Sequence, residues 1–130
     1  MNGRYLLDTN VIIALFGGEE TVLDRLAGAA AVFVPIVAPG ELYYGARKSA
    51  RAEQNVRRID DFAAAATLLD CNQATAKRYG EIKNSLHTKG RPIPENDIWI
   101  GALGMQHDLS VATRDYEHFS QISGLRMEAW

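Results

Sequence analysis

Short apolar runs that alternate with helical segments constrain the fold of this chain more than any other feature of its sequence. The runs are rich in valine, leucine and isoleucine and cover residues 4–7, 32–34, 67–70, 109–113 and 125–130. Buried strands that alternate with helices are typical of a parallel sheet covered on both faces. The sequence therefore predicts an α/β fold: a three-layer α/β/α domain with a central, mostly parallel sheet of four to five short strands.

The segments between these runs carry apolar residues at helical spacing. Helices are expected over residues 9–16, 19–27, 39–49, 52–66, 73–87 and 95–107. The side chain of Asn72 is expected to cap the fifth helix. In the second helix, Val22, Leu23 and Leu26 are expected to face inward. The pattern contains no repeat or linker, so a single domain is expected over residues 1–130.

Length and composition exclude several classes of protein. The 130 residues are 47% hydrophobic and carry mixed charge, which excludes a disordered chain and allows one core. No apolar run has the length of a membrane span, and Asp8 interrupts the first run too early for a signal peptide. The single cysteine, Cys71, cannot form an internal disulfide and suits a reducing compartment. A cytoplasmic protein without a membrane segment is therefore expected.

Four carboxylates stand where an apolar run ends or begins: Asp8, Glu41, Asp97 and Asp115. Asp8 and Asp115 follow predicted strands, and the other two acids lie near the starts of predicted helices. Ligands of parallel sheets bind beyond the carboxyl ends of the strands, so all four acids can converge on one edge. Acids beside core residues are costly unless a cation neutralises them, and oxygen-only sites favour magnesium or manganese. The pattern predicts a metal-dependent enzyme.

Each acid also has a purely structural explanation. Asp8 could cap the helix that follows it, and Asp115 could be a turn residue. Glu41 and Asp97 could be first-turn acids that the helix dipole favours. A common edge favours one site over four separate explanations.

Other chemistries fit the sequence less well. The three histidines have no ligand-like spacing with Cys71, so a zinc site is not expected. No serine lies in a Gly-x-Ser-x-Gly turn. Gly40 and Gly45 have the spacing of a phosphate-binding loop, but the required Lys-Ser/Thr does not follow them. An aspartyl-phosphate enzyme, such as a haloacid-dehalogenase-like phosphatase, would need an acid at Asn10.

Five segments, taken in order, resemble PIN-domain nucleases. They are Leu6-Leu-Asp-Thr-Asn-Val-Ile, Gly40-Glu-Leu-Tyr-Tyr-Gly, Pro92-Ile-Pro-Glu-Asn-Asp-Ile-Trp-Ile, Ala112-Thr-Arg-Asp-Tyr-Glu-His-Phe and Gly124-Leu-Arg-Met-Glu-Ala-Trp. The resemblance covers essentially the whole chain and is greatest to VapC-type toxins, the ribonuclease half of bacterial toxin–antitoxin pairs. It implies a PIN-like fold and a metal-dependent endoribonuclease.

The resemblance also implies the roles of particular residues. Four acids would be catalytic and would hold Mg²⁺, with Mn²⁺ as a substitute: Asp8, Glu41, Asp97 and Asp115. Asp8 and Asp97 would be the firmest ligands, and the other two would complete the site directly or through water. Asn10 and Thr113 would support these acids without touching the metal.

In the implied mechanism, magnesium would lower the pKa of a bound water and stabilise charge on the scissile phosphate. In-line attack would leave a 5′-phosphate and a 3′-hydroxyl. No histidine is needed as a base, and none is expected in the site. Gly101 stands where alanine is expected, a difference expected to be harmless for packing.

Clustered basic residues indicate where RNA could bind. Without the four acids, 14 basic residues stand against 12 acidic ones, and the basic residues lie in groups. The candidates for RNA contact are Arg47, Lys48, Arg51, Lys89 and Arg91. Ordinary solvated helix faces would produce a similar pattern.

Two protein partners are expected, a small antitoxin from the resemblance and a second copy of the chain. Tyr43, Tyr44, Phe62 and Trp99 could line an apolar groove for either, although the core is the favoured place for Phe62 and Trp99. Two alternative functions stay open on the same fold. One is a PIN nuclease of RNA maturation rather than a toxin, and the other is a catalytically silent RNA- or protein-binding domain.

Overall fold

The sheet of this protein has five strands, all parallel, in the order β3-β2-β1-β4-β5. The structure is a computed structural model that describes residues 3–130. The strands are β1 (Arg4–Leu7), β2 (Ala31–Pro35), β3 (Leu68–Leu69), β4 (Ser110–Thr113) and β5 (Met127–Ala129). In the central strand β1, Leu6 stands opposite Phe33 of β2 and Val111 of β4. The predicted parallel α/β sheet is confirmed.

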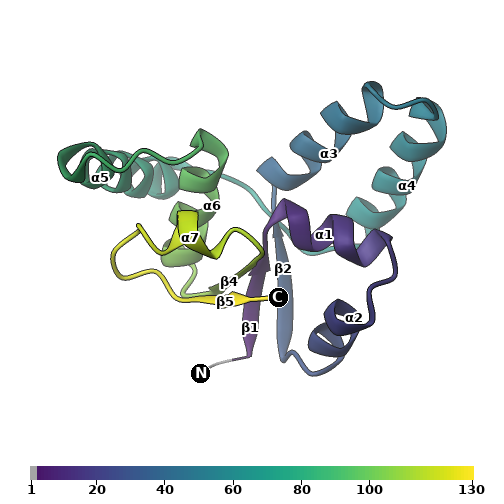
Figure 1. Ribbon diagram of the computed structural model, residues 1–130, viewed down its shortest axis with the longest axis horizontal. Helices are drawn as coiled ribbons and strands as arrows, with labels where there is room; N and C mark the ends of the chain where they lie inside the picture. The colour runs from purple at the N-terminus through teal and green to yellow at the C-terminus, as the bar shows by residue number, and fades with distance from the viewer. Residues whose placement is uncertain (1–2) are drawn as a thin grey trace.

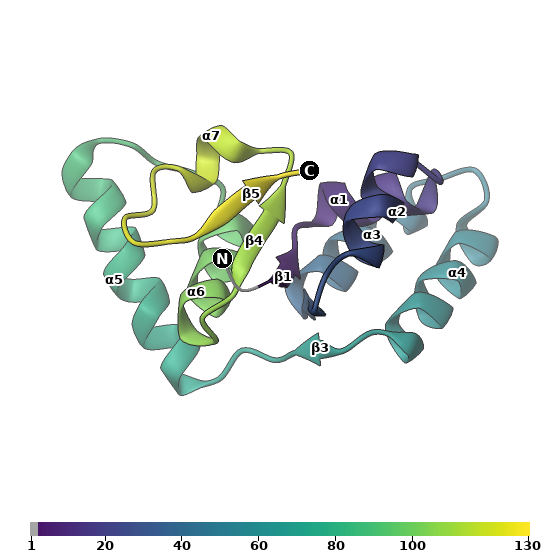
Figure 2. The same ribbon diagram turned by 90° about the horizontal axis from the view of Figure 1, so that it is seen from below.

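Helices cover both faces of this sheet (Figure 1, Figure 2). They are α1 (Thr9–Phe16), α2 (Glu20–Ala27), α3 (Val37–Arg47), α4 (Ala52–Ala65), α5 (Gln73–Lys89), α6 (Glu95–Gln106) and α7 (Tyr116–Phe119). Figure 1 shows α1 to α4 on one side of the strands and α5 to α7 on the other, so the predicted three layers are present. Within residues 3–130, no helix is long and apolar enough to cross a membrane.

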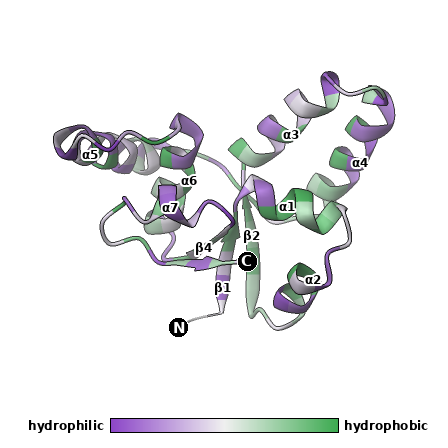
Figure 3. Cartoon of the chain, in the orientation of Figure 1, coloured by the Kyte–Doolittle hydropathy of each residue, from purple (hydrophilic) through white to green (hydrophobic). Residues whose placement is uncertain are grey.

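The central strand β1 sends alternate side chains into two cores. Tyr5 and Leu7 belong to the core formed with α1 to α4, whereas Leu6 belongs to the core formed with α5, α6 and α7. Figure 3 shows hydrophobic residues along β2 and over most of α1, and among these Val34 and Ile12 are buried in the first of these cores. Complete burial of one such leucine stabilises a fold by about 1.5–3 kcal/mol. A strand of four residues is thereby fixed firmly at the point where Asp8 follows it.

Three details differ from the prediction. α3 begins at Val37, two residues before its expected start. Pro39 lies in the first turn of this helix, where the N–H that proline lacks would have no partner inside the helix. Leu23 of α2 was expected to face inward but is 44% exposed, whereas Val22 is buried. The one-turn helix α7 is not predicted from the sequence.

Two glycines allow α6 to lie close to its neighbours. A β-carbon at Gly101 would stand 2.6 Å from Cδ1 of Ile122, and one at Gly104 would stand 3.0 Å from Cγ2 of Val111. Glycine at position 101, where alanine is expected, is harmless for packing here and leaves room for the side chain of Ile122. This close approach fixes the position of α6 against β4, and hence the position of the acid that α6 carries near its start.

Candidate active site

Two neighbouring strands bring two of the predicted acids to one edge of the sheet. Asp8 directly follows β1, and Asp115 lies two residues beyond β4. The backbone N–H of Asp8 donates to the carbonyl oxygen of Ala112 at 2.9 Å, which continues the pairing of β1 with β4 past the end of β1. Since the strands are parallel, both acids lie at the carboxyl edge, where such sheets bind their ligands.

Asp8 is a buried carboxylate, only 3% exposed. Its Oδ1 accepts a hydrogen bond from the backbone N–H of Thr9, and its Oδ2 accepts one from the hydroxyl of Thr113, each at 2.8 Å. The pKa of Asp8 is raised to about 6: burial is the main cause and the negative charges of Asp97 and Asp115 add to it, against the lowering effect of the two hydrogen bonds. Asp8 also caps α1, so its structural explanation is correct and is compatible with a role in the site.

Glu41 reaches the same edge from α3, the helix that follows β2. It is the fifth residue of this helix and so lies in the second turn rather than at the start. The hydroxyl of Thr9 donates to Oε1 of Glu41 at 2.7 Å. Thr9 thus holds two acids at once, Asp8 through its backbone N–H and Glu41 through its side chain.

Asp97 reaches the edge from the first turn of α6 and is 8% exposed. Burial raises the pKa of its carboxyl group, and the charges of Asp115 and Glu41 act in the same direction. His118 opposes this shift, because its Nδ1 lies 2.9 Å from Oδ2 of Asp97. Asp97 is therefore a second acid held largely out of water beside other carboxylates.

Asp115 differs from these acids because its side chain is exposed. Its backbone N–H donates to the hydroxyl of Thr113 at 2.8 Å. The same hydroxyl donates to Asp8, so Thr113 connects the acid after β1 with the acid after β4.

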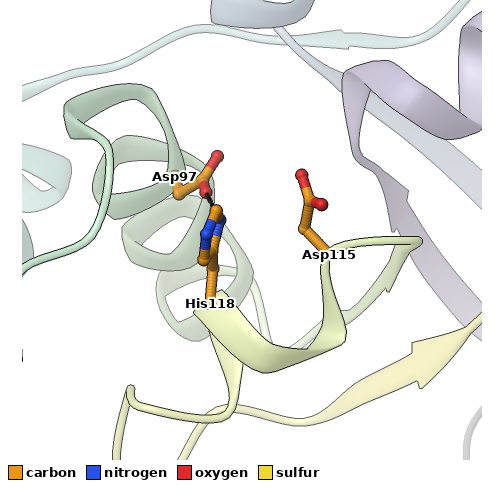
Figure 4. Close-up of side chains that lie close together, drawn as sticks. All are labelled: Asp97, Asp115 and His118. Atoms are coloured by element: carbon orange, nitrogen blue, oxygen red, sulfur yellow. Dashed lines mark hydrogen bonds and ion pairs between the residues drawn. The ribbon is translucent and has the colours of Figure 1, made fainter.

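The charges of Asp97 and Asp115 act on Asp8, and those of Asp115 and Glu41 act on Asp97, so the four acids lie around a common space. Without a cation, such crowding disfavours the charged forms. Oxygen atoms of Asp97 and Asp115 and a ring nitrogen of His118 lie within 4.8 Å of one another (Figure 4). A donor set composed mainly of carboxylate oxygens fits a hard divalent cation such as Mg²⁺ or Mn²⁺.

Two members of this arrangement are not predicted from the sequence. Thr9 contacts Asp8 and Glu41, and His118, which was expected to take no part, contacts Asp97. The spacing of three residues from Asp115 to His118 is the one signal for the histidine, because residues three apart share one side of a helical turn. Asn10 was predicted to support the first acid, but its Oδ1 instead accepts the backbone N–H of Arg114 at 3.2 Å. Asn10 thus joins α1 to the turn before α7.

The five predicted RNA-contact residues lie on two separate segments: Arg47, Lys48 and Arg51 around the α3–α4 turn, and Lys89 and Arg91 around the end of α5. Arg47 pairs with Glu53 at 3.1 Å, and Nζ of Lys48 lies 4.3 Å from the ring centroid of Tyr44. Nζ of Lys89 donates to the carbonyl oxygen of Gln121 at 2.7 Å. Figure 1 shows the α3–α4 turn and α5 on opposite sides of the molecule, so these residues do not form one patch.

Known proteins resemble this chain over nearly its whole length. The PIN domain family matches residues 5–125. Ribonuclease VapC2 of Haemophilus influenzae is 35% identical over 129 residues, which are 98% of each chain. The tRNA(fMet)-specific endonuclease VapC of Shigella flexneri is 30% identical over the same share of each chain. The crystal structure of DNA-bound VapBC from Salmonella typhimurium contains a chain with a TM-score of 0.90 and 29% identity, again over 98% of both chains.

The chain belongs to the PIN-domain family, as a ribonuclease of the VapC type. The resemblance found in the five sequence segments is confirmed, and so is the predicted class of enzyme, an endoribonuclease.

Proposed function

We propose that this protein is the toxin of a toxin–antitoxin pair and cuts RNA with Mg²⁺ held by Asp8, Glu41, Asp97 and Asp115. The observation that carries the proposal is the convergence of these acids, from four different segments of the chain, on one edge of the sheet. The names of the relatives, which are ribonucleases and endonucleases, support the reaction. The raised pKa values of Asp8 and Asp97 support the need for a cation, since a bound ion would hold both in their charged forms at neutral pH.

The ion, Mg²⁺ or in its place Mn²⁺, supplies an activated water when bound and stabilises negative charge on the scissile phosphate. Asp8 and Asp97 present buried carboxylates with little freedom to move, and the two more accessible acids complete the site. Thr9 and Thr113 fix the orientation of these acids through their hydrogen bonds. The products expected from this reaction carry a 5′-phosphate and a 3′-hydroxyl.

A small antitoxin protein is the proposed partner, because the VapBC structures that this chain resembles are toxin–antitoxin complexes. A groove of about 240 Å³ between α1, α3 and α4 reaches Glu41. Ile13 and Phe16 of α1 lie along it, and Ile13 is 57% exposed. An apolar segment of the partner in this groove would end beside the acids and block access to them.

The aromatic residues predicted for a partner groove do not line this one. Tyr43 donates a hydrogen bond to Asp60, and Tyr44 lies beside Lys48. Phe62 packs edge-to-face against Phe16, with ring centroids 5.3 Å apart. Trp99 stacks on Tyr79, with ring centroids 4.2 Å apart. The homodimer therefore stays part of the proposal without an assigned surface.

The test is cleavage of total cellular RNA by the purified protein, with magnesium, with chelator, and with an Asp97→Asn variant in parallel. Discrete magnesium-dependent fragments, absent from the variant, are expected. Initiator tRNA is the first defined substrate to try, since two relatives are named tRNA(fMet)-specific endonucleases. A folded wild-type protein that cuts no RNA would contradict the proposal and favour a silent RNA- or protein-binding domain. Cleavage without toxicity in cells would favour a nuclease of RNA maturation.

A further inference from the structure

His118 approaches Asp97 from a turn that also carries Asp115. Its Nδ1 lies 2.9 Å from Oδ2 of Asp97. Its backbone N–H donates to the carbonyl oxygen of Asp115 at 3.0 Å, so the two residues belong to the same helical turn. The imidazole thereby joins the acid that arrives from α6 to the turn that holds the acid after β4.

The position of this imidazole is fixed by the core beneath it. The next residue, Phe119, is fully buried in the core formed with α5 and α6. The side chain of His118 is 43% exposed, whereas that of Asp97 is 11% exposed, so the ring covers the outer side of the carboxylate. Figure 4 shows one oxygen of Asp97 against the ring and the other pointing away from it.

We propose that His118 is a positioning residue of the metal site. Its Nδ1–H donates to Oδ2 of Asp97 and thereby leaves Oδ1 of the same carboxylate free for the metal ion. This inference rests on the proposed function, because it requires Asp97 to hold a metal. A hydrogen bond to a metal-binding carboxylate fixes its orientation and strengthens the site. Thr113 supports Asp8 in the same way from β4.

A direct bond from the imidazole to the metal is the competing arrangement, since the ring nitrogen and the two carboxylates lie close enough to share one ion. Substitution of His118 by asparagine distinguishes the two arrangements. The amide of asparagine can donate from about the position of Nδ1, so it preserves the positioning hydrogen bond. A spin-echo measurement on bound Mn²⁺ detects a nitrogen ligand directly and needs no variant.

The experiment is titration of the metal-free protein with Mn²⁺ in the absence of RNA. The proteins compared are the wild type, His118→Asn, His118→Ala and a control His87→Asn, in which a histidine of α5 outside the site is changed. His118→Ala is expected to weaken Mn²⁺ binding by about 10- to 100-fold. His118→Asn is expected to bind within about threefold of the wild type, because it keeps the donor. Wild-type Mn²⁺ is expected to show no directly bound nitrogen.

Each other result overturns the inference. Unchanged Mn²⁺ affinity in His118→Ala would show that His118 does not position Asp97, while leaving the proposed function intact. A directly bound nitrogen in the wild type would make His118 a ligand instead. If the wild type binds no Mn²⁺ at all, the proposed function fails and this inference fails with it. The wild-type spectrum shows whether His118 is a direct ligand even if the alanine variant does not fold.

Discussion

The acids after β1 and β4 stand on neighbouring strands but differ in their surroundings. Asp8 is 3% exposed, holds two hydrogen bonds and has a pKa raised to about 6. Asp115 is exposed, and within residues 3–130 its carboxylate accepts no hydrogen bond. The chain therefore orders one acid by its own hydrogen bonds and leaves the carboxylate of the other free to adjust. Both depend on the hydroxyl of Thr113, which is the physical link between them.

In the metal-free protein, the burial of Asp8 lowers the free energy of unfolding when this acid is charged. A pKa of about 6 lies roughly two units above that of a free aspartate. At neutral pH this difference lowers the free energy of unfolding by about 3 kcal/mol. That cost falls on the buried carboxylate of Asp8. A bound cation would remove it, so the buried acid should dominate the response of the protein to metal.

The largest expected effect is on catalysis. Asp8→Asn should lower the rate of RNA cleavage by more than about 100-fold, because it removes a preordered ligand charge. Asp115→Asn should lower it by only about 10-fold, because an exposed acid can be replaced in part by water. Cleavage of a defined RNA under single-turnover conditions measures both. Equal losses of rate in the two variants would show that the buried Asp8 and the exposed Asp115 contribute equally to cleavage.

The second effect concerns pH and the metal-free protein. The folded pKa of Asp8 lies above the unfolded value of 3.8, so protonation favours the native state. Its contribution is fully present below about pH 4 and is lost as the pH rises through about 6. The stability of Asp8→Asn should therefore equal or exceed that of the wild type at pH 7.5, by at most about 3 kcal/mol, and the excess should shrink toward pH 4.

Urea unfolding in the presence of chelator, repeated between pH 4 and pH 7.5, measures this difference. Asp115→Asn serves as the control and should follow the wild type within about 0.5 kcal/mol. A pH-independent difference between Asp8→Asn and the wild type would mean that burial does not raise the pKa of Asp8.

Magnesium should stabilise the folded protein by mass action. At a concentration 100 times the Kd, the free energy of unfolding should rise by about 2.7 kcal/mol. The gain should disappear in Asp8→Asn and persist in weakened form in Asp115→Asn. Urea unfolding at fixed magnesium concentration is the measurement, with calcium and potassium as ion controls. Equal stabilisation of Asp8→Asn and the wild type would place the ion elsewhere.

The smallest effect should come from the shared hydroxyl. Thr113→Val keeps the shape of a fully buried side chain but removes both of its hydrogen bonds, at a cost of about 1–3 kcal/mol. It should also raise the pKa of Asp8 further, because the hydroxyl favours the charged carboxylate. Thr113→Ser is the matched control and should recover most of both effects. Equal stability of the valine and serine variants would show that the hydroxyl does not couple the two strands.

The parts of this molecule that the sequence predicts are those that local patterns determine. The segment Arg4–Leu7, Asp8 and Thr9–Phe16 was predicted as a strand, an acid and a helix because its apolar period changes at the acid. A rule for parallel sheets then predicted that the acids share one edge. Neither step needs knowledge of contacts between distant segments.

The remaining features depend on contacts that no local pattern contains. The hydroxyl of Thr113 meets Asp8 across 105 residues of chain, and His118 meets Asp97 across 21. The close approach at Gly101 involves Ile122, which lies on a later segment of the chain. Such contacts follow from how closely α6, α7 and β4 pack, which composition and periodicity do not report. Helix starts are similarly weak, as the early start of α3 before Pro39 shows.

The central claim is that the buried Asp8 and Asp97, together with Glu41 and the exposed Asp115, surround a single metal site. Crystals of the wild-type protein soaked in Mn²⁺, with data collected at the manganese edge, test it most directly. We expect one or two anomalous peaks within bonding distance of carboxylate oxygens from both Asp8 and Asp97, with Asp115 turned toward them. Peaks confined to other acids, with the site empty at saturating Mn²⁺, would contradict the claim.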